Sequence, residues 1–591
     1  MCGTPNTTYD GFSEDQQAYL DGLLKKLDLH AAFERPGGTA TQDVTVFGTP
    51  YEDLCGEEQA KADTHPWDLW PKMREHALGG RFAEGLDSFN FKHHGMFNVA
   101  PAQRGYMCRL RIPGGLLRGD QLAMLGDAAE EFAGGYAHLT TRGNLQVREI
   151  APENFIKWLE RVYAIGLTSK GSGADSVRNI TLSPTAGFDA QELIDLSPQA
   201  RDTHHLILNS RDLHGLPRKF NISFDCGGLS SCVSDTNDIA YLATRIKDRA
   251  EVDESLRGAV LCHVLLGGIT GHQDFARGTG WFLRPDDTVA ASGAMLRVFA
   301  EHGDRTNRKR ARLKYLLDAH GFDWFIERAQ EKLDEEAAAL GCEPVRFLRV
   351  PEAACEARVV MDRQAHVGVH AQRDGKFHVG VLLPVGRMTP DQMRGVAELS
   401  QRYGKNDLRL TVWQNLLIPH VAEQDVQAVV AGVEALGLAT SASSFHAGAV
   451  ACTGKWACKY GSAHTKETLA PLVEHLASRF TLDTPINIHA TGCSHSCAQH
   501  YIGDIGLLGA ATEAGEEAFQ VFLGGGSDND QGLARHLVGP VPVTDLPAFL
   551  ETVIATYLER RDDGERFLDF TRRHSEEQLR EMFVGAEAVA C

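Results

Sequence analysis

The sequence lacks several features that would identify its class at once. No apolar run approaches the ~18 residues of a membrane-spanning helix, and residues 1–15 carry no basic stretch followed by an apolar one. We therefore expect a cytoplasmic protein without a membrane partner. Positive charge is in deficit, because 59 Lys and Arg face 79 Asp and Glu, a formal charge of −20. Since nucleic acid attracts basic surfaces, we expect no nucleic-acid partner.

Cysteines and nucleotide-binding signatures are also scarce. Thirteen cysteines in 591 residues are too few for a disulfide scaffold, so closely spaced pairs are better interpreted as metal ligands or redox groups. No Gly-x-Gly-x-x-Gly opens a βαβ unit, so the sequence gives no sign of a flavin or nicotinamide site. The chain is too long for one ordinary core, and several domains are expected.

What the sequence does contain is one pattern that occurs twice. With Pro113 placed on Pro384, four further anchors align at the same constant offset: Asp120 with Asp391, Thr140 with Thr411, Asn144 with Asn415, and Gly166 with Gly437. The alternative is two unrelated βαβ units that look alike. An ungapped register across all five anchors favours an internal duplication, and hence an α+β protein with pseudo-twofold symmetry.

Each copy is predicted to run strand, turn, helix, strand, helix. In the first copy the expected elements are a strand at 107–112, a helix at 120–132 with helical apolar spacing, a strand at 139–146 and a helix at 155–165. Because side chains alternate along a strand, Thr140 and Arg142 should share one face of the second strand.

Four cysteines form the strongest motif. They make a C-x5-C pair and a C-x3-C pair: Cys452, Cys458, Cys493 and Cys497. Four thiolates are the usual complement of a [4Fe–4S] cube. Zinc is one alternative, although its structural sites space their ligands as C-x2–4-C, and burial as small apolar residues is the other. A second C-x5-C pair, Cys226 and Cys232, has no C-x3-C partner, so we interpret it as structural or vestigial and assign it no metal.

With its duplicated pattern and cysteine spacing, the chain resembles the sirohaem nitrite and sulfite reductases. Thr491-Gly-Cys-Ser-His-Ser-Cys-Ala-Gln499 and Asp504-Ile-Gly-Leu-Leu-Gly509 are similar to the family's second cluster motif. The resemblance covers roughly residues 91–570. It implies that the four cysteines hold a [4Fe–4S] cluster and that Cys497 also ligates the sirohaem iron. Where the family has Pro-Asn, this chain has Ser494-His495.

The resemblance also implies the domain organisation. We expect two ferredoxin-like half-domains and two larger α/β lobes. The expected parts are an N-terminal extension at 1–90, a first half-domain at 91–170, a first sirohaem-binding lobe with a largely helical bridge at 171–350, a second half-domain at 351–440, and the cluster and sirohaem lobe at 441–591.

An anion pocket follows from the same resemblance, made of Arg109, Arg178, Lys219 and Asn221. Lys219 and Asn221 lie two apart on an expected strand, so both can face one pocket. In the family, Lys-x-Asn accompanies nitrite reductases and Lys-x-Lys accompanies sulfite reductases. Because nitrite carries one charge and sulfite two over much of the neutral range, Lys219-Phe220-Asn221 favours nitrite. The implied activity is an assimilatory, monomeric nitrite reductase supplied with electrons by a donor such as ferredoxin.

Sirohaem carries many carboxylates and needs a basic, hydrogen-bonding cradle. The expected contacts are Thr140, Arg142, Asn144, Gln146, Arg218, Arg308, Gln414, Asn415 and the axial Cys497. Arg308 belongs to a stretch, 305–314, with six basic residues in ten. Without the resemblance, that stretch would be interpreted as a solvated helix face or a nucleic-acid patch.

Three rival functions stay open at this point. The first is sulfite reduction to sulfide. The second is a precorrin-3B synthase, which is built on a related scaffold and binds a tetrapyrrole as its substrate. The third is an electron carrier without catalysis, which the set of Arg109, Arg178 and Lys219 disfavours because a carrier needs no anion pocket.

Overall fold

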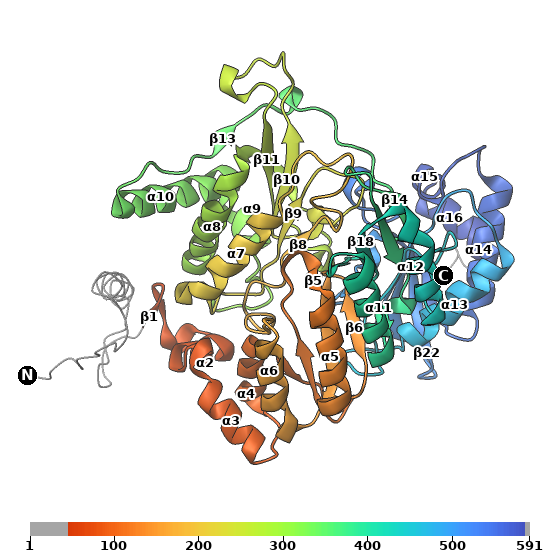
Figure 1. Cartoon of the computed structure of the whole chain (residues 1–591), viewed down its shortest axis with the longest axis horizontal. Helices are drawn as coiled ribbons and strands as arrows, with labels where there is room; N and C mark the ends of the chain where they lie inside the picture. Colours follow the sequence, from red (N-terminus) through yellow and green to blue (C-terminus); the bar gives the residue numbers. More distant parts are fainter. Residues whose placement is uncertain (1–44, 586–591) are drawn as a thin grey trace, which may run out of the picture. The chain divides into compact units, whose positions relative to one another are not determined.

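The computed structural model describes residues 45–585, and the chain divides into two units, Met1–Tyr51 and Glu52–Cys591. In the first unit, β1 (Thr45–Val46) and β2 (Thr49–Pro50) form a small antiparallel hairpin. The elements described below belong to the second unit (Figure 1). Among the described residues, no helix has the length and apolar character needed to cross a bilayer.

The repeat seen in the sequence is a repeat in the structure. Helices of the first copy recur in the second at the same constant offset and with the same lengths: α5 (Gly119–Phe132) with α11 (Pro390–Tyr403), and α6 (Phe155–Ala164) with α12 (Val426–Ala435). The turn before each pair contains a residue of left-handed backbone, Gly114 (φ 66°) and Val385 (φ 45°). The predicted duplication is therefore confirmed, and two unrelated βαβ units are excluded.

The two half-domains exchange short strands. One sheet runs β16-β6-β7-β4-β3 and the other β14-β15-β18-β17-β5, all antiparallel. Strand β5 pairs with β17 of the second copy, and β16 pairs with β6 of the first. The bounds are β3 (Met96–Asn98), β4 (Tyr106–Arg109), β5 (Leu116–Arg118), β6 (Ala137–Thr140), β7 (Asn144–Ile150), β14 (Gly368–Ala371), β15 (Phe377–Val381), β16 (Arg387–Met388), β17 (Asp407–Leu410) and β18 (Leu416–Val421).

One apolar core joins the two half-domains. Helices α5 and α11 pack side by side (Figure 1), and Leu122 and Leu125 of the first share a buried cluster with Met393 and Val396 of the second. Helical spacing of these residues places them on one face of each helix. The halves therefore form one body.

Each larger lobe contains a mixed sheet. The first runs β13-β12-β11-β10-β9-β8 and the second β19-β20-β21-β22-β23. In both, the three strands that come first in the chain are parallel and the next pairs with the third antiparallel. The bounds are β8 (Thr181–Leu182), β9 (Ile222–Asp225), β10 (Ile239–Arg245), β11 (Val260–Leu266), β12 (Arg277–Leu283), β13 (Leu348–Arg349), β19 (Ala449–Ala451), β20 (Ile488–Thr491), β21 (Ile505–Ala511), β22 (Glu517–Leu523) and β23 (Arg535–Pro542).

Helices cover these two sheets. Apolar residues of α8, such as Met295 and Phe299, share a buried cluster with the first sheet, and Val553 of α14 does so with the second. The bounds are α7 (Ser197–Asn209), α8 (Thr288–His302), α9 (Leu313–His320), α10 (Phe322–Leu340), α13 (Lys466–Arg479), α14 (Leu546–Arg560), α15 (Phe567–Arg573) and α16 (Glu576–Val584).

The two lobes are also related to each other. The N–H of Asn221 donates to the Asp238 carboxylate (2.9 Å), and in the second lobe the N–H of Asn487 donates to the Asp504 carboxylate (2.7 Å). The loop from β9 to β10 is thus the counterpart of the loop from β20 to β21. Cys226 and Cys232 lie buried in the first loop, while Cys493 and Cys497 lie in the second.

One expected element was wrong. The strand expected at 139–146 is a hairpin, in which Thr140 pairs with Asn144 across a tight turn and Gly143 takes a φ of 54°. Arg142 is therefore in a turn and does not alternate with Thr140 on a strand. The glycine permits the left-handed conformation that this tight turn needs.

The basic stretch 305–314 is not a helix until α9 begins at Leu313. The Asp304 carboxylate accepts the N–H groups of Thr306 and Asn307 and holds the chain in a turn. Arg305 and Arg312 are each only 4% exposed, whereas Lys309 and Arg310 are exposed, so the stretch is not a solvated helix face. Within the bridge expected to end at residue 350, α9 and α10 span Leu313–His320 and Phe322–Leu340.

Residues 52–90 are more than an appended extension. They form α2 (Gly56–Asp63), α3 (Trp70–Leu78) and α4 (Gly85–Asn90). Met73 and Ala77 of α3 are buried in the core of the half-domains. The remainder of the expected extension, residues 1–44, lies outside the described residues.

Candidate functional site

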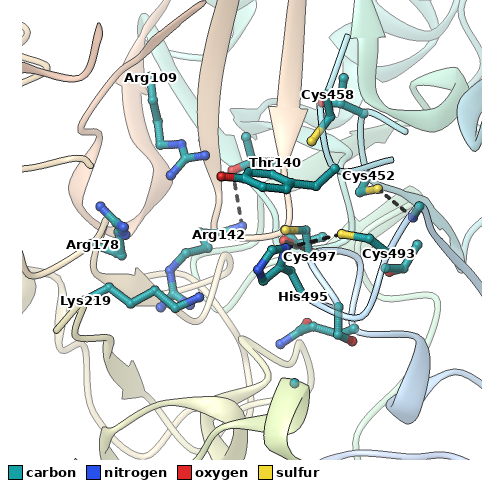
Figure 2. Close-up of a pocket in the computed structure, with 18 of the residues that line it drawn as sticks. Arg109, Thr140, Arg142, Arg178, Lys219, Cys452, Cys458, Cys493, His495 and Cys497 are labelled. Atoms are coloured by element: carbon teal, nitrogen blue, oxygen red, sulfur yellow. Dashed lines mark hydrogen bonds between the residues drawn. The ribbon is translucent and has the colours of Figure 1, made fainter. Parts of the chain in front are cut away.

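A cavity of about 910 Å³ lies among loops contributed by both half-domains and both lobes (Figure 2). Its walls include the β6–β7 turn, the segment before β9, the loop after β11, the basic stretch before α9, and the two cysteine loops. The predicted site residues that line it are Arg109, Thr140, Arg142, Asn144, Gln146, Arg178, Arg218, Lys219, Asn221, Arg308, Gln414, Cys452, Cys458, Cys493 and Cys497.

Asn415 is the exception among the predicted residues. Its side-chain oxygen accepts the N–H of Leu383 (2.9 Å) and so ties two strands of the second half-domain together. Gln414 reaches the cavity, but its amide bonds to the backbone of Leu139 and of Ala451. The Asn415 side chain therefore links strands of the sheet and is not among the residues that line the cavity.

The cysteine loops follow parallel strands. Cys452 comes directly after β19, and Gly492 and Cys493 come directly after β20. Because carboxyl ends of parallel strands meet at one edge of a sheet, the loops lie together, and the Gly492 N–H donates to Cys452 Sγ (3.2 Å). Figure 2 shows the four sulfur atoms around a common space. Within residues 45–585, no three Cys, His, Asp or Glu side chains converge on a single-ion site.

Burial makes the Cys452 and Cys493 thiols poor acids in the protein alone. It raises the pKa of Cys452 to about 12, with the Cys497 thiol adding to the effect, and it raises the pKa of Cys493. A thiolate ligand at this position therefore requires a bound metal, since coordination deprotonates the thiol.

Cationic side chains face the cysteines across the cavity. Figure 2 shows Arg109, Arg178, Lys219 and Arg142 on the side opposite the sulfur atoms. The Arg109 guanidinium lies 4.7 Å from the centre of the Phe97 ring. Arg142 donates to the side-chain oxygen of Asn237 (2.5 Å) and to the carbonyl of Asn179 (3.3 Å).

Lys219 and Asn221 both face the cavity, while Phe220 between them is fully buried in the lobe core. The predicted alternation is correct, although β9 begins only at Ile222. Burial lowers the pKa of Lys219 to about 7, and neighbouring Arg312 and Arg178 add to this effect. The ammonium is thus poised to lose or regain a proton near neutral pH.

Several buried polar atoms at the cavity have no partner in the protein. Within the described residues, Arg178 Nη1 and both ring nitrogens of His138 are buried without a hydrogen bond. Burial holds the pKa of Arg178 well below its usual range. Buried polar atoms of this kind normally have partners, so an anionic, hydrogen-bonding ligand fits the cavity.

Arg308 and Arg218 are held by an internal carboxylate. Arg308 makes a two-pronged contact with Asp175 (2.7 and 2.9 Å), and Arg218 lies 3.7 Å from it. Lys61 of α2 is a third cation on the same carboxylate (3.2 Å). Both arginines line the cavity as predicted, but part of their charge is already balanced.

Sequence reasoning missed several lining residues, among them Lys92, His138, Arg148, Arg312 and Lys466. Arg312 lies in the same basic stretch as Arg308, so the sequence could have identified it as a site residue. It forms a two-pronged ion pair with Asp238 (2.8 and 3.0 Å). No motif or cluster of charges pointed to His138 or Lys466, because each is an isolated residue in its segment.

The donor set fits the two expected cofactors. Four thiols around one space match the ligands of a [4Fe–4S] cube. The cations and orphaned donors opposite them match an acidic tetrapyrrole and a small anion. These residues are contributed by widely separated parts of the chain, so the cavity exists only in the complete fold.

Comparison with known proteins agrees with this geometry. The family profile described as "Nitrite and sulphite reductase 4Fe-4S domain" matches residues 173–337 and 444–588. The profile described as "Nitrite/Sulfite reductase ferredoxin-like half domain" matches residues 100–165 and 370–436. Each profile matches the chain twice, as the two structural repeats require.

Individual relatives include enzymes named for each anion. A ferredoxin–nitrite reductase of Synechococcus elongatus is 32% identical over 76% of this chain and 85% of its own length. Sulfite reductase 2 of Mycolicibacterium paratuberculosis, whose name includes ferredoxin, is 32% identical over 81% of this chain and 84% of its own. The structure of the Mycobacterium tuberculosis NirA protein superposes with a TM-score of 0.77 at 27% identity, covering 89% of this chain and 98% of that one. The chain therefore belongs to the nitrite and sulfite reductases, the oxidoreductases whose cofactors are a [4Fe–4S] cluster and sirohaem.

Proposed function

We propose that this protein is an assimilatory nitrite reductase, which converts nitrite to ammonium with six electrons and eight protons, releasing two waters. The observation that carries the proposal is Asn221, which stands beside Lys219 at the cavity where a sulfite reductase would carry a second lysine. Each cation about 4 Å from a bound anion contributes about 4 kcal/mol at an effective dielectric of about 20. A pocket with one cation fewer is therefore matched to the monoanion.

The cofactors supply electrons, and the pocket residues supply charge and protons. When bound, sirohaem joined to the cluster delivers electrons to the substrate one at a time. Arg109 and Arg178 are suited to forked hydrogen bonding of an oxyanion. Lys219, with its pKa lowered to about 7 by burial, is suited to giving up protons as N–O bonds break. Asn221 can donate a hydrogen bond to the anion without adding charge.

A ferredoxin is the proposed electron donor. The names of the relatives from Synechococcus elongatus and Mycolicibacterium paratuberculosis both include ferredoxin. The formal charge of −20 gives no overall attraction to an acidic donor, so docking would depend on a local basic patch. Salt dependence of turnover with reduced ferredoxin, compared with a small dye donor, tests this point.

The substrate is tested by steady-state assays of the purified holoenzyme with reduced methyl viologen as donor. We expect kcat/KM for nitrite to exceed that for sulfite by at least tenfold, with ammonium as the product. A value for sulfite equal to or above that for nitrite would refute the proposal and favour sulfite reduction to sulfide.

A matched variant tests Asn221, the residue on which the assignment of nitrite rather than sulfite depends. Asn221→Lys restores the second cation, so we expect the preference to shift toward sulfite by one to two powers of ten. The sirohaem and iron contents should equal those of the wild type, because the substitution adds charge without touching the cysteines. An unchanged preference would show that Asn221 does not select the anion.

A further inference from the structure

The loop between the third and fourth cysteines contains a histidine that touches a cysteine. His495 Nδ1 lies 3.4 Å from Cys493 Sγ (Figure 2). The backbone N–H of the same histidine also donates to this sulfur, which lowers the pKa of Cys493 against the effect of burial. One residue therefore places a ring nitrogen and its backbone N–H beside one sulfur atom.

The imidazole ring is held in this orientation by its surroundings. The Tyr460 ring meets it edge-on, with ring centres 5.1 Å apart and planes at 77°. His495, Tyr460 and Cys493 all line the same cavity. The edge-to-face contact restricts the plane of the imidazole ring, and Nδ1 is the ring nitrogen that lies toward the sulfur.

We propose that His495 is a positioning residue that raises the reduction potential of the cluster by donating a hydrogen bond from Nδ1 to the Cys493 sulfur. The inference rests on Cys493 being a cluster ligand. Hydrogen bonds to ligand sulfurs withdraw negative charge from a cluster and stabilise its reduced, more negative form. A neutral ring protonated on Nδ1 is sufficient, and no change of protonation is needed.

Which nitrogen donates can be tested by amide substitutions. The amide nitrogen of Asn in His495→Asn is as far from the backbone as Nδ1 of histidine. The amide nitrogen of Gln in His495→Gln is as far from the backbone as Nε2. His495→Phe keeps an aromatic ring for Tyr460 but removes the donor. Ser494→Ala, at the exposed neighbouring position of the same loop, is the control.

The measurement is the midpoint potential of the cluster in each reconstituted holoenzyme, from a redox titration followed by electron paramagnetic resonance without substrate. We expect more negative potentials in the Phe and Gln variants, and values near the wild type in the Asn variant and the control. Equal potentials in all five proteins would overturn the proposal. So would an Asn variant that shifts as far as the Phe variant, because the effect would then come from the ring itself.

Two further readouts separate this proposal from its premises. Iron content of Cys493→Ala tests the ligand, and retention of all five irons per chain, four in the cluster and one in sirohaem, would overturn the premise and the proposal with it. Since the titration contains neither nitrite nor sulfite, a failure of the nitrite assignment leaves the potential shift intact. A normal nitrite activity with no shift in the His495 variants would refute only the tuning role.

Discussion

Replacing Asp175 by Asn would remove a negative charge from between three cations. The carboxylate is fully buried and contacts Lys61 at 3.2 Å, Arg308 at 2.7 Å and Arg218 at 3.7 Å. Breaking a buried pair by removing one partner costs about 3–5 kcal/mol. Arg308 and Arg218 keep some contact with solvent, 19% and 32% exposed, so we expect the lower end, about 3 kcal/mol of unfolding free energy.

The pH dependence of this loss has a definite sign. Although burial alone raises it, Lys61 and Arg308 hold the pKa of Asp175 well below its usual value of 3.8. A depressed carboxyl pKa contributes stability that is present above the unfolded pKa and lost as the pH falls through the folded pKa. The difference between wild type and Asp175→Asn should therefore be constant from pH 8 to about pH 5 and shrink below pH 4.

The assay is urea unfolding of the holoenzyme, followed by tryptophan fluorescence at several pH values. A double-mutant cycle with Lys61→Met isolates the ion pair, and we expect a coupling of about 0.5–3 kcal/mol. A loss below about 1 kcal/mol at pH 7, or strictly additive single variants, would refute the view that this carboxylate organises the three cations.

The remaining predictions concern titration, ligation and catalysis. Burial, reinforced by the Asp528 carboxylate, raises the pKa of Asp235 to about 7, so its contribution to stability falls by up to about 1.4 kcal/mol per pH unit between pH 4 and 7. Asp235→Asn should remove this slope and be more stable than wild type at pH 8, and an unchanged slope in urea midpoints would contradict the assignment. Cys452→Ala should lose the cluster, measured as iron per chain and as the visible spectrum, whereas retention of all five irons, four in the cluster and one in sirohaem, would exclude Cys452 as a ligand. Lys219→Gln should lower kcat for nitrite by about 10²-fold or more with normal sirohaem content, and a wild-type rate would exclude Lys219 as a proton donor.

Local features of the site were readable from the sequence because they depend on spacing within one segment. The spacing of the four cysteines and the periodicity of the repeated helices were visible in the sequence, and the pair Lys219 and Asn221 followed from the family resemblance. These features could be predicted without knowing which distant segments pack against them.

Features that depend on tertiary partners were not readable. Arg308 looked free to bind a cofactor carboxylate, and nothing in its own segment revealed that Asp175 lies against it. Asn415 repeats the position of Asn144, yet only Asn144 borders the cavity. His138 is one isolated histidine in an apolar strand, and only the folded sheet shows that its nitrogens lack partners.

The strand exchange between the half-domains has a consequence for synthesis on the ribosome. Leu117 of β5 pairs with Leu408 of β17, so the chain must grow through the whole first lobe and the helical bridge before the first strand finds its neighbour. At the usual rates of translation, extension from Leu117 to Leu408 takes roughly 15–60 s. During this time β6 of the nascent first half-domain is an unpaired sheet edge, because β16 has not yet been synthesised. Unpaired strand edges are surfaces that chaperones bind.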